Sequence, residues 1–549
     1  MDKERRGFIK KSLLICAGFN FIHAKDIFND TELKRELNSI PAKLFGILGD
    51  GISDETDSIN LAIQYLSDRG GGELIFDEGI YLINKFEYID VLGLMPTGIN
   101  FKKNVKIVGS GNNTIFKLGS STNGKPFILF NCYLQENCGI SNFSIDGNQI
   151  NNRSLQTDLK SPRTIVRVAA SMCFSMSNIN IYNADVNNYV YIGQNVNTDY
   201  NNTITNCNFT VSANNGHNYD HSTIYLASVG TVMYGCKVQA IPILLNKATR
   251  ELMQSSGIEI HASNIKILNN IVSGYNYIGY ISSQEMILNN ILIQGNFLSS
   301  ANGFAWAGSK NAVSNLRIID NKIEMFQPVI SNNFGQCAIV RYPKVAISSI
   351  YITNNVFFVK CAKNPKMSLL FLIHNSGDSI LMKDITINNN KIQTNQSVFM
   401  VFDGCILEKF QILHNEISIL NKGLGIGVFH FAMPSFSHGQ ISNNYYDIIN
   451  GETDFYVLMY MNNSQKYITY QYNTSSSNLV PKLEFFFNVL SSDVTSTYSI
   501  DSFVKFQSMP PISGIWLKGQ KVYNNYKTDN RILGWLCIDN GNPGTWVSF

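Results

Sequence analysis

LRIIDNKI (residues 316–323), IYITNNVF (350–357) and ITINNNKI (385–392) share a pattern of alternating apolar and polar residues that leads into an asparagine and a second apolar pair. The same pattern occurs in ITNCNF (204–209), IKILNNIV (265–272), ILIQGNFL (291–298), FQILHNEI (410–417) and QISNNYY (440–446). Alignment of these stretches places the recurring asparagine at 208, 270, 296, 321, 355, 390, 415 and 444. The spacing, about 25 to 35 residues with one double step, is typical of a β-solenoid whose coils carry loops of different length.

The alternation of apolar and polar residues, with a period of two, explains why the coils of such a repeat must stack. It turns the Ile, Leu and Val side chains inward and leaves the polar residues on the outer face. A single coil cannot bury its inner face, but coils stacked about 4.8 Å apart pair in parallel sheets and enclose one core. Asparagine tolerates left-handed backbone geometry and can bond its equivalent in the next coil, so we interpret the recurring asparagines as a structural ladder.

The composition supports a β-rich protein with an uncharged polar surface. Hydrophobic residues make up 44% of the 549 residues and charged residues 15%, below the roughly 25% of an average domain. The net charge of +3 gives no support to nucleic-acid or anionic-membrane binding. The ten cysteines form no C-x-x-C pair, so we expect no metal site and no cofactor, although an exported protein could bridge Cys132 to Cys138.

Residues 1–24 have the features of an export signal. KERRGFIKK (3–11) carries paired arginines followed by a hydrophobic residue and lysines, and an apolar run over 13–21 comes next. This arrangement resembles a twin-arginine signal peptide, with an ordinary amphipathic helix as the alternative. We expect recognition by the twin-arginine translocase, a periplasmic or secreted location, and no stable membrane insertion, because no later segment approaches eighteen uninterrupted apolar residues.

The stretch LFGILGDGISDETDSI (44–59), followed by LAIQYLSDRGGGELIFDEGIYLI (61–83), predicts a helix over about 56–68. Asp54 or Thr56 can cap its start, and the glycines at 70–72 end it before a strand. At this point the sequence resembles the pectate-lyase-like superfamily, in which an F-G-A-x-G-D-G-x-x-D-D-T opening and a helix cap the solenoid. The resemblance is clearest over 44–83 and weaker through 450. It implies an all-β, right-handed, single-stranded parallel β-helix, a polysaccharide as partner, and a homotrimer as a possible assembly.

The chain divides by pattern into four parts. These are a signal peptide (1–24), the parallel β-helix (40–450, with a capping segment at 44–83), a transition β segment (451–505) and a small C-terminal β module (506–549). Short strands between Gly, Asn and Pro turns predict an antiparallel module. Its tryptophans, Trp516, Trp535 and Trp546, could bind sugar or form a capping core.

One set of strands carries the candidate site. NYVYIGQ (188–194), STIYLAS (222–228), SGIEIHAS (256–263), IGYISS (278–283) and GFAWAGS (303–309) align as successive coils. Their outward column reads Tyr191, Tyr225, Glu259, Tyr280 and Trp306, with His261 beside it. Aromatic rings stack on sugar C–H surfaces and a carboxylate can act on the glycosidic oxygen, so this column predicts a sugar-processing groove. The alternative is that the aromatic residues pack under loops.

The loop NNGHNYDH (214–221) adds further candidates. For hydrolysis, which typically uses two carboxylates, we pair Glu259 with Asp220 and leave the stereochemistry open. For a lyase reaction, His217, His221 or Tyr219 would act as base and Arg250 would neutralise a uronic carboxylate.

The pectin-cleaving members of the superfamily carry motifs that this sequence lacks. Asn197-Thr198-Asp199 and Gly216-His217-Asn218 are only fragments of the polygalacturonase motifs, and there is no aspartate-rich calcium site. We therefore expect an exported enzyme that cleaves glycosidic bonds of another bacterial glycan. The alternatives are a non-catalytic glycan-binding protein of exopolysaccharide synthesis or export, and an adhesin or tailspike-like structural protein.

Overall fold

The computed structural model describes most of the chain beyond residue 38. The described segments are 39–88, 95–122, 125–152, 163–193, 200–212, 221–241, 255–283, 287–305, 311–327, 346–361, 368–372, 380–394, 397–401, 405–419, 429–431, 435–448, 459–462, 465–471, 474–475, 485–488, 499–501, 505–507, 510–512, 516, 518–519, 521–524 and 534–549. The export signal predicted at 1–24 lies outside them. The chain forms two compact units, residues 1–279 and 280–549, which are described in turn.

The first unit opens with the capping segment. Its buried Glu55 carboxylate accepts the backbone N–H groups of Leu48 and Gly49, at 2.8 and 3.2 Å. Helix α3 (Thr56–Asp68) follows, and its first N–H donates to the Asp54 carboxylate at 3.1 Å. The predicted helix over 56–68 is therefore confirmed.

Helix α3 covers the end of the solenoid with its apolar face. Ile59, Ala62, Ile63 and Leu66 are buried on that face, and α3 contacts β3 (Gly72–Ile75), β6 (Pro96–Asn100) and β7 (Val105–Val108). Gly70 and Gly71 end the helix in backbone conformations with positive φ, +96° and +109°, which glycine adopts without steric cost. The helix thus shields the first coils from solvent.

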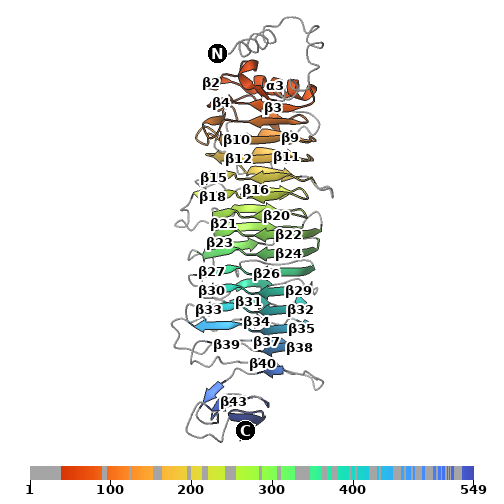
Figure 1. Ribbon diagram of the computed structural model, residues 1–549, viewed down its shortest axis with the longest axis vertical. Coiled ribbons are helices and arrows are strands. Elements are labelled where there is room, and N and C mark those ends of the chain that lie inside the picture. The colour runs from red at the N-terminus through yellow and green to blue at the C-terminus, as the bar shows by residue number, and fades with distance from the viewer. Residues whose placement is uncertain are drawn as a thin grey trace, which may run out of the picture. The chain divides into compact units, whose positions relative to one another are not determined.

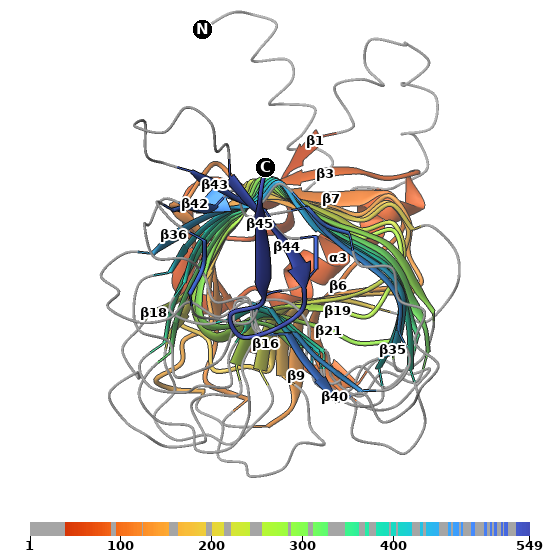
Figure 2. The same ribbon diagram turned by 90° about the horizontal axis from the view of Figure 1, so that it is seen from below.

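The strands of the first unit form three walls, which Figures 1 and 2 show from the side and from the end. Wall A contains β6, β9 (Phe127–Tyr133), β11 (Arg163–Ala169), β13 (Asn188–Gly193), β16 (His221–Ala227) and β19 (Ser255–Ile260). Wall B contains β1 (Ser39–Pro41), β3, β7, the first halves of β10 (Gly139–Asp146) and β12 (Ser175–Tyr182), β14 (Thr203–Thr205), β17 (Val232–Tyr234) and β20 (Lys266–Leu268). Wall C contains β2 (Asp50–Asp54), β4 (Gly79–Ile83), β8 (Thr114–Leu118), the second halves of β10 and β12, β15 (Asn208–Ser212), β18 (Lys237–Ile241) and the start of β21 (Ile271–Ile281). All these pairings are parallel, apart from a short antiparallel pairing of β5 (Glu87–Tyr88) with β6.

The inward side chains of the three walls make a dry core. Val190, Ile224 and Ile258, which the sequence predicts to point inward, are at most 1% exposed. Near α3 the core is aromatic, with Phe116 packed against Phe143 at a ring-centroid distance of 4.6 Å. Burial of this apolar surface, at about 25 cal/mol per Å², is what makes stacking of the coils favourable.

The second unit repeats walls B and C. Its wall-B strands are β22 (Leu288–Gln294), β24 (Val313–Ile319), β26 (Ile347–Thr353), β29 (Ile380–Asn388), β32 (Cys405–Leu413), β35 (Ser435–Ser442), β38 (Gln465–Gln471) and β41 (Ser499–Asp501). Its wall-C strands are β23 (Phe297–Ala305), β25 (Lys322–Gln327), β27 (Val356–Cys361), β30 (Lys391–Thr394), β33 (Glu416–Ile419), β36 (Tyr445–Ile448) and β39 (Thr474–Ser475). Two further parallel sheets contain β28 (Ser368–Leu372), β31 (Ser397–Val401) and β34 (Phe429–Phe431), and β37 (Met459–Asn462) and β40 (Phe485–Asn488). Parallel coils therefore continue well past residue 450.

An asparagine ladder runs along the corner between walls B and C of the second unit. Each ladder side chain from Asn296 to Asn444 is buried, and each up to Asn415 donates from Nδ2 to Oδ1 of the next, at 2.9 to 3.1 Å. The Oδ1 atoms also accept the backbone N–H of the preceding ladder residue at 2.9 to 3.0 Å. The predicted ladder is confirmed over Asn296, Asn321, Asn355, Asn390, Asn415 and Asn444.

The sequence alignment is wrong by one residue at Asn208. The ladder position of that coil is Cys207, whose backbone N–H contacts Cys236 Sγ at 3.4 Å, while the Cys236 N–H donates to Asn270 Oδ1 at 2.8 Å. Asn208 instead lies half-buried on β15 and donates to Asn180. Among the described residues Cys132, Cys138, Cys207 and Cys236 are buried free thiols, so the bridge considered for Cys132 and Cys138 is not formed.

The C-terminal module is a mixed sheet of four strands, β42 (Lys505–Gln507), β43 (Lys521–Asn524), β44 (Gly534–Asp539) and β45 (Thr545–Ser548). The last three pair antiparallel as expected, but β42 pairs parallel with β43. Trp516 and Trp535 are buried with Val522 and Cys537, and Trp546 packs on Trp516 at 4.7 Å between ring centroids. The tryptophans thus form the small core of this module.

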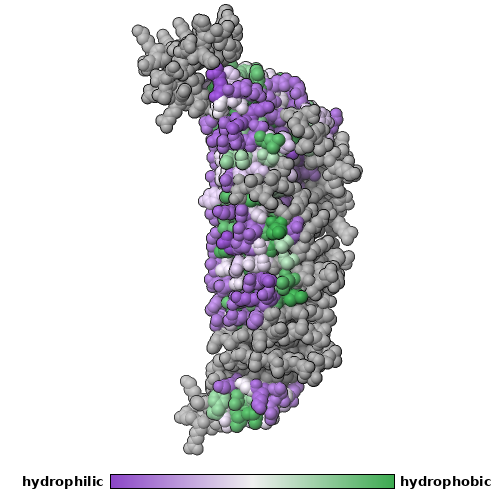
Figure 3. Space-filling view, turned by 90° about the vertical axis from the view of Figure 1, so that its right-hand side faces the viewer, coloured by the Kyte–Doolittle hydropathy of each residue, from purple (hydrophilic) through white to green (hydrophobic). Residues whose placement is uncertain are grey.

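On the face that Figure 3 shows, the coloured part is largely hydrophilic with small separate hydrophobic patches. No helix in the described part of the chain is long and apolar enough to cross a membrane.

Replacement of one ladder residue tests the role of the ladder. In Asn355→Ala, the Asn321 N–H and the Ile318 carbonyl lose their partner, and we expect the free energy of unfolding to fall by about 1–3 kcal/mol. The control is Asn354→Gly, an exposed position with φ of +57° whose side chain accepts one solvent-exposed hydrogen bond from Asn389, and this change should lower stability much less. Equal effects of the two variants in urea unfolding would contradict the ladder's role.

Candidate functional site

The strands of wall A bend at one position in every coil. In four of the five strand pairs the register skips a residue, for example between Ser222 and Ile224 opposite Ser256 and Ile258, and the pairing of β13 with β16 begins just after this position. A Cβ added at Gly257 would meet Val272 and Tyr275 in the core, so two consecutive residues of this strand face inward. The outward side chains that flank the bend therefore lean towards each other across neighbouring strands.

The outward column after the bend brings the predicted residues together. The register aligns Tyr191 with Tyr225 and Tyr225 with Glu259. The two tyrosine rings stack at 4.8 Å between centroids with an interplanar angle of 10°. The His261 ring stacks on Tyr225 in turn, at 4.5 Å and 22°. Three rings thus form a continuous stack that ends beside a carboxylate.

The Glu259 carboxylate is held on both sides. Its Oε1 lies 2.8 Å from His261 Nε2, and its Oε2 accepts the Ser222 hydroxyl, which also contacts the Ser256 hydroxyl at 2.9 Å. The side chains of Glu259 and His261 are 17% and 13% exposed, so the pair is shielded but reachable from solvent. A carboxylate and an imidazole in contact can exchange a proton with a bound ligand, which is the requirement for general acid–base chemistry.

The structure places His221 inside the protein. Its Nδ1 lies 2.8 Å from the Val186 carbonyl and its Nε2 lies 3.0 Å from the Thr223 hydroxyl, which contacts the buried Tyr275 hydroxyl at 2.8 Å. The side chain is 7% exposed, and burial lowers its pKa below the usual 6.5. Both ring nitrogens of His221 thus have a partner inside the protein, so the side chain is not available to a ligand on the outer face of wall A.

The other predicted site residues fall in three places. Asp220, His217, Tyr219, Arg250 and Trp306 lie outside the described residues. Tyr280 is half-buried on β21 and belongs to the second unit. Of the predicted set, the structure therefore brings together Tyr191, Tyr225, Glu259 and His261.

Sequence reasoning missed Arg167, which precedes Tyr191 in the same column. Its guanidinium lies over the Tyr133 ring, 5.5 Å from the centroid, and Nη1 donates to Asn131 Oδ1 at 3.3 Å. Burial lowers its pKa, an effect that the neighbouring tyrosines oppose. Extending the alignment one coil upstream, from NYVYIGQ to RTIVRVA (163–169), would have found it.

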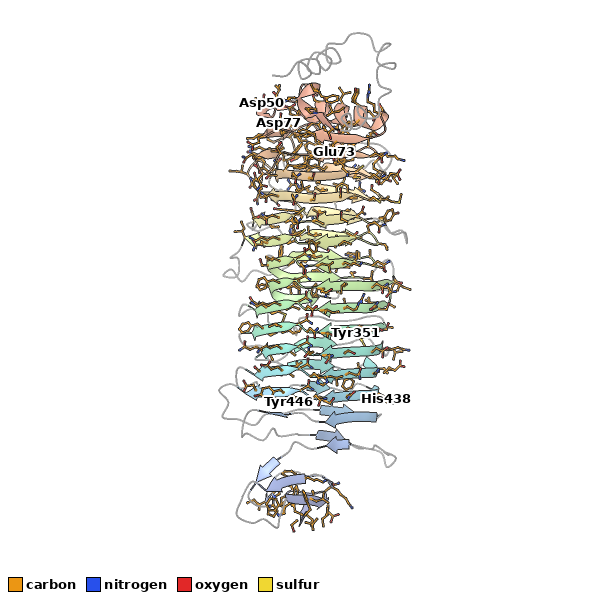
Figure 4. The ribbon with its side chains drawn as sticks, in the orientation of Figure 1. Asp50, Glu73, Asp77, Tyr351, His438 and Tyr446 are labelled. Atoms are coloured by element: carbon orange, nitrogen blue, oxygen red, sulfur yellow. The ribbon has the colours of Figure 1, made fainter. Side chains whose placement is uncertain are left out.

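Other acidic residues have structural partners. Asp50, Glu73 and Asp77 all lie near the N-terminal end of the first unit (Figure 4). Hydrogen bonds from the Ser53 and Ile52 backbone lower the pKa of Asp50. Glu73 accepts the Ser39 hydroxyl, and Asp77 pairs with Lys43 at 3.0 Å. In the described part of the chain no group of three His, Cys, Asp or Glu side chains could hold a metal ion.

Comparison with known sequences finds short matches to enzymes of alginate metabolism. No family model matches the chain. Mannuronan C5-epimerase AlgE1 of Azotobacter vinelandii is 34% identical over 115 residues, and Alginate lyase 7 of the same organism is 34% identical over 113 residues. Each match covers 20% of this chain, and the matched parts are 8% and 13% of those proteins. The chain thus spans only a small part of the curated relatives it matches.

Comparison with solved structures finds matches over most of the chain. The tailspike protein of E. coli bacteriophage HK620, in complex with a pentasaccharide, has a TM-score of 0.60 at 16% identity, over 85% of this chain and 84% of that one. A single-site mutant of the same tailspike reaches 0.63 at 15% identity, over 95% of both chains. The fold is that of the tailspikes. The predicted fold class, a parallel β-helix with a capping helix and a small C-terminal β module, is confirmed.

The buried His221 generates a pH prediction. In the unfolded chain this histidine binds a proton below about pH 6.5, whereas burial lowers its pKa in the folded protein. The contribution of His221 to the stability of the fold is therefore complete above that pH and decreases as the pH falls. The non-titrating variant His221→Gln should be less stable than wild type at pH 7.5. The difference in the free energy of unfolding between the two proteins should be smaller at pH 5, by at most about 1.4 kcal/mol per pH unit. Chemical unfolding of both proteins at the two pH values measures it, and a difference that stays constant would contradict this assignment.

Proposed function

We propose that wall A binds a polysaccharide and that Glu259 acts in cleavage of its glycosidic bonds. The observation that carries the proposal is the stack of Tyr191, Tyr225 and His261, which ends at the Glu259 carboxylate. The rings are half-buried, and aromatic side chains of this kind provide contact area for sugar rings at low entropic cost. Short matches to alginate-modifying enzymes and the fold of a tailspike seen with a pentasaccharide support a glycan as ligand.

Two kinds of chemistry fit this site. In hydrolysis, Glu259 protonates the glycosidic oxygen or activates water, and a second carboxylate completes the pair. We propose Asp220 for that role, because it directly precedes β16, the strand next to Glu259. In a lyase reaction, a neutral imidazole takes the proton beside a uronic carboxylate, with His261 or His217 as base and Arg250 as the neutralising cation.

A non-catalytic glycan-binding protein is the second candidate. It is favoured by the hydrogen bonds of Glu259, because both carboxylate oxygens already have a protein partner, Ser222 or His261. Such a carboxylate can serve as a fixed acceptor for sugar hydroxyls without any proton transfer. The two functions share wall A and differ only in turnover.

We also propose export through the twin-arginine pathway, based on residues 5 and 6 and the apolar run that follows. Arg5→Lys together with Arg6→Lys should leave the full-length precursor in the cytoplasm, whereas the wild-type chain is processed and found outside the inner membrane. Fractionation and immunoblotting check this. Export of the double variant at the wild-type level would contradict the assignment.

The variant Glu259→Gln tests catalysis. Glutamine keeps the size of the side chain and a hydrogen-bonding oxygen but cannot exchange a proton, so we expect cleavage to fall by about 100-fold or more while glycan affinity changes little. The measurement is product release from a panel of bacterial polysaccharides, with ultraviolet absorbance of unsaturated uronate ends to separate lyase from hydrolase.

Glu136→Gln is the matched control, since Glu136 pairs with Lys103 away from the outward column of wall A, and it should leave cleavage unchanged. Unaltered cleavage by Glu259→Gln would remove Glu259 from the mechanism. Binding without cleavage by the wild-type protein would establish the second candidate function.

A further inference from the structure

Two cysteines lie at the corner between walls B and C in the first unit. Cys207 and Cys236 are 29 residues apart in sequence and occupy the position that asparagine fills in the later coils. The strands on either side of them pair in register, because β14 aligns with β17 and β15 with β18 at the same offset. The two cysteines therefore occupy equivalent positions in adjacent coils.

The two side chains are placed close enough for a covalent bond. Cys236 Sγ contacts the Cys207 backbone N–H at 3.4 Å, and each thiol can donate to the carbonyl two residues before it, at 3.2 Å for Thr205 and 3.4 Å for Tyr234. Adjacent coils are about 4.8 Å apart, within the range of about 4.4–6.8 Å that Cα atoms joined through a disulfide span. Rotation of one side chain about its Cα–Cβ bond is the movement that brings the sulfurs together.

The surroundings of the two thiols make their chemistry unequal. Hydrogen bonding by the Cys207 side chain lowers the pKa of Cys236, an effect that burial opposes. The thiolate is the nucleophile in thiol–disulfide exchange, so Cys236 is the sulfur that we expect to react first. Both residues are at most 2% exposed, and an oxidant therefore reaches them only while the two coils are apart at this corner.

We propose that Cys207 and Cys236 are a site of disulfide formation between adjacent coils, with a small disulfide or a thiol–disulfide oxidoreductase as the oxidant. The Cys236 thiol loses its proton to water and attacks one sulfur of the oxidant, whose other sulfur leaves as a thiolate. The Cys207 thiol then loses its proton and attacks Cys236 Sγ, which expels the second thiolate. Two thiols of the protein are oxidised and one disulfide of the oxidant is reduced. This inference is independent of the proposed glycan function.

The bond would hold together the part of the first unit that carries the candidate site. Strand β16, with Ser222 and Tyr225, lies between the two cysteines in the sequence. A covalent loop reduces the conformational freedom of the unfolded chain, so the bridged protein should resist urea better than the reduced protein. The later coils hold the same corner by amide hydrogen bonds, and here a covalent bond would replace them.

The test exposes the purified full chain to oxidised glutathione, in buffer and in urea below the unfolding midpoint, where the corner can open locally. Peptic digestion at low pH stops thiol exchange, and mass spectrometry identifies the peptides that contain residues 207 and 236. We expect these two residues to be linked, with the loss of two free thiols per chain. Reduction should restore both thiols, and the bridged protein should have a higher urea midpoint than the reduced one.

The variants Cys207→Ser and Cys236→Ser should each abolish the shift in urea midpoint between the oxidised and reduced protein. Each variant is compared with itself in the two redox states, so a general loss of stability caused by the substitution cancels. The control is Cys537→Ser, because Cys537 is a buried free thiol of the C-terminal module that donates to the Asp539 carbonyl at 3.1 Å. It should keep the shift.

Three results would overturn the inference. These are thiols at 207 and 236 that stay free under both conditions, glutathione that remains on Cys236 without transfer to Cys207, and a link from either residue to a different cysteine. A bridge in a protein that binds no glycan would support this inference and count against the proposed function. Cleavage of a glycan by a protein whose two thiols never bridge would do the reverse.

Discussion

In-register parallel pairing between successive coils is the constraint on which the rest of this protein depends. A slip of one residue would turn every inward Ile and Leu of a strand to the solvent, so the register is tied to burial of the core. The ladder from Asn296 to Asn444 fixes the register at one corner of the second unit, because each amide bonds both the side chain and the backbone of its neighbours. In the first unit Cys207 and Cys236 occupy the same corner position.

The candidate site is a direct consequence of this register. Tyr191, Tyr225 and Glu259 are 34 residues apart in sequence at each step, yet lie on adjacent strands. Strand spacing matches the stacking distance of aromatic rings, so identical positions in successive coils place rings face to face at 4.8 Å. The bend in wall A adds the Ser222 contact that holds the carboxylate. A wall that is rigid for reasons of folding thus holds in a preorganised row the groups that we propose to contact sugar.

The sequence allowed prediction of the solenoid, the helix over 56–68 and the outward column, because each depends on local periodicity or capping. It did not allow the ladder to be aligned correctly at Cys207, since a small buried thiol there replaces the amide that the pattern search looked for. The burial of His221 was also unpredictable, because it depends on the Val186 carbonyl of the preceding coil, which lies 35 residues away in sequence and comes close only when the coils stack. Arg167 was missed because the alignment of wall A began one coil too late.

The most direct test of the central claim, that wall A is a glycan-binding surface, is a crystal structure of the Glu259→Gln variant with an oligosaccharide of a polysaccharide that the protein binds. We expect sugar rings along wall A, in contact with Tyr191 and Tyr225, with a glycosidic oxygen within hydrogen-bonding distance of residue 259. An oligosaccharide bound only to wall B, wall C or the C-terminal module would contradict it.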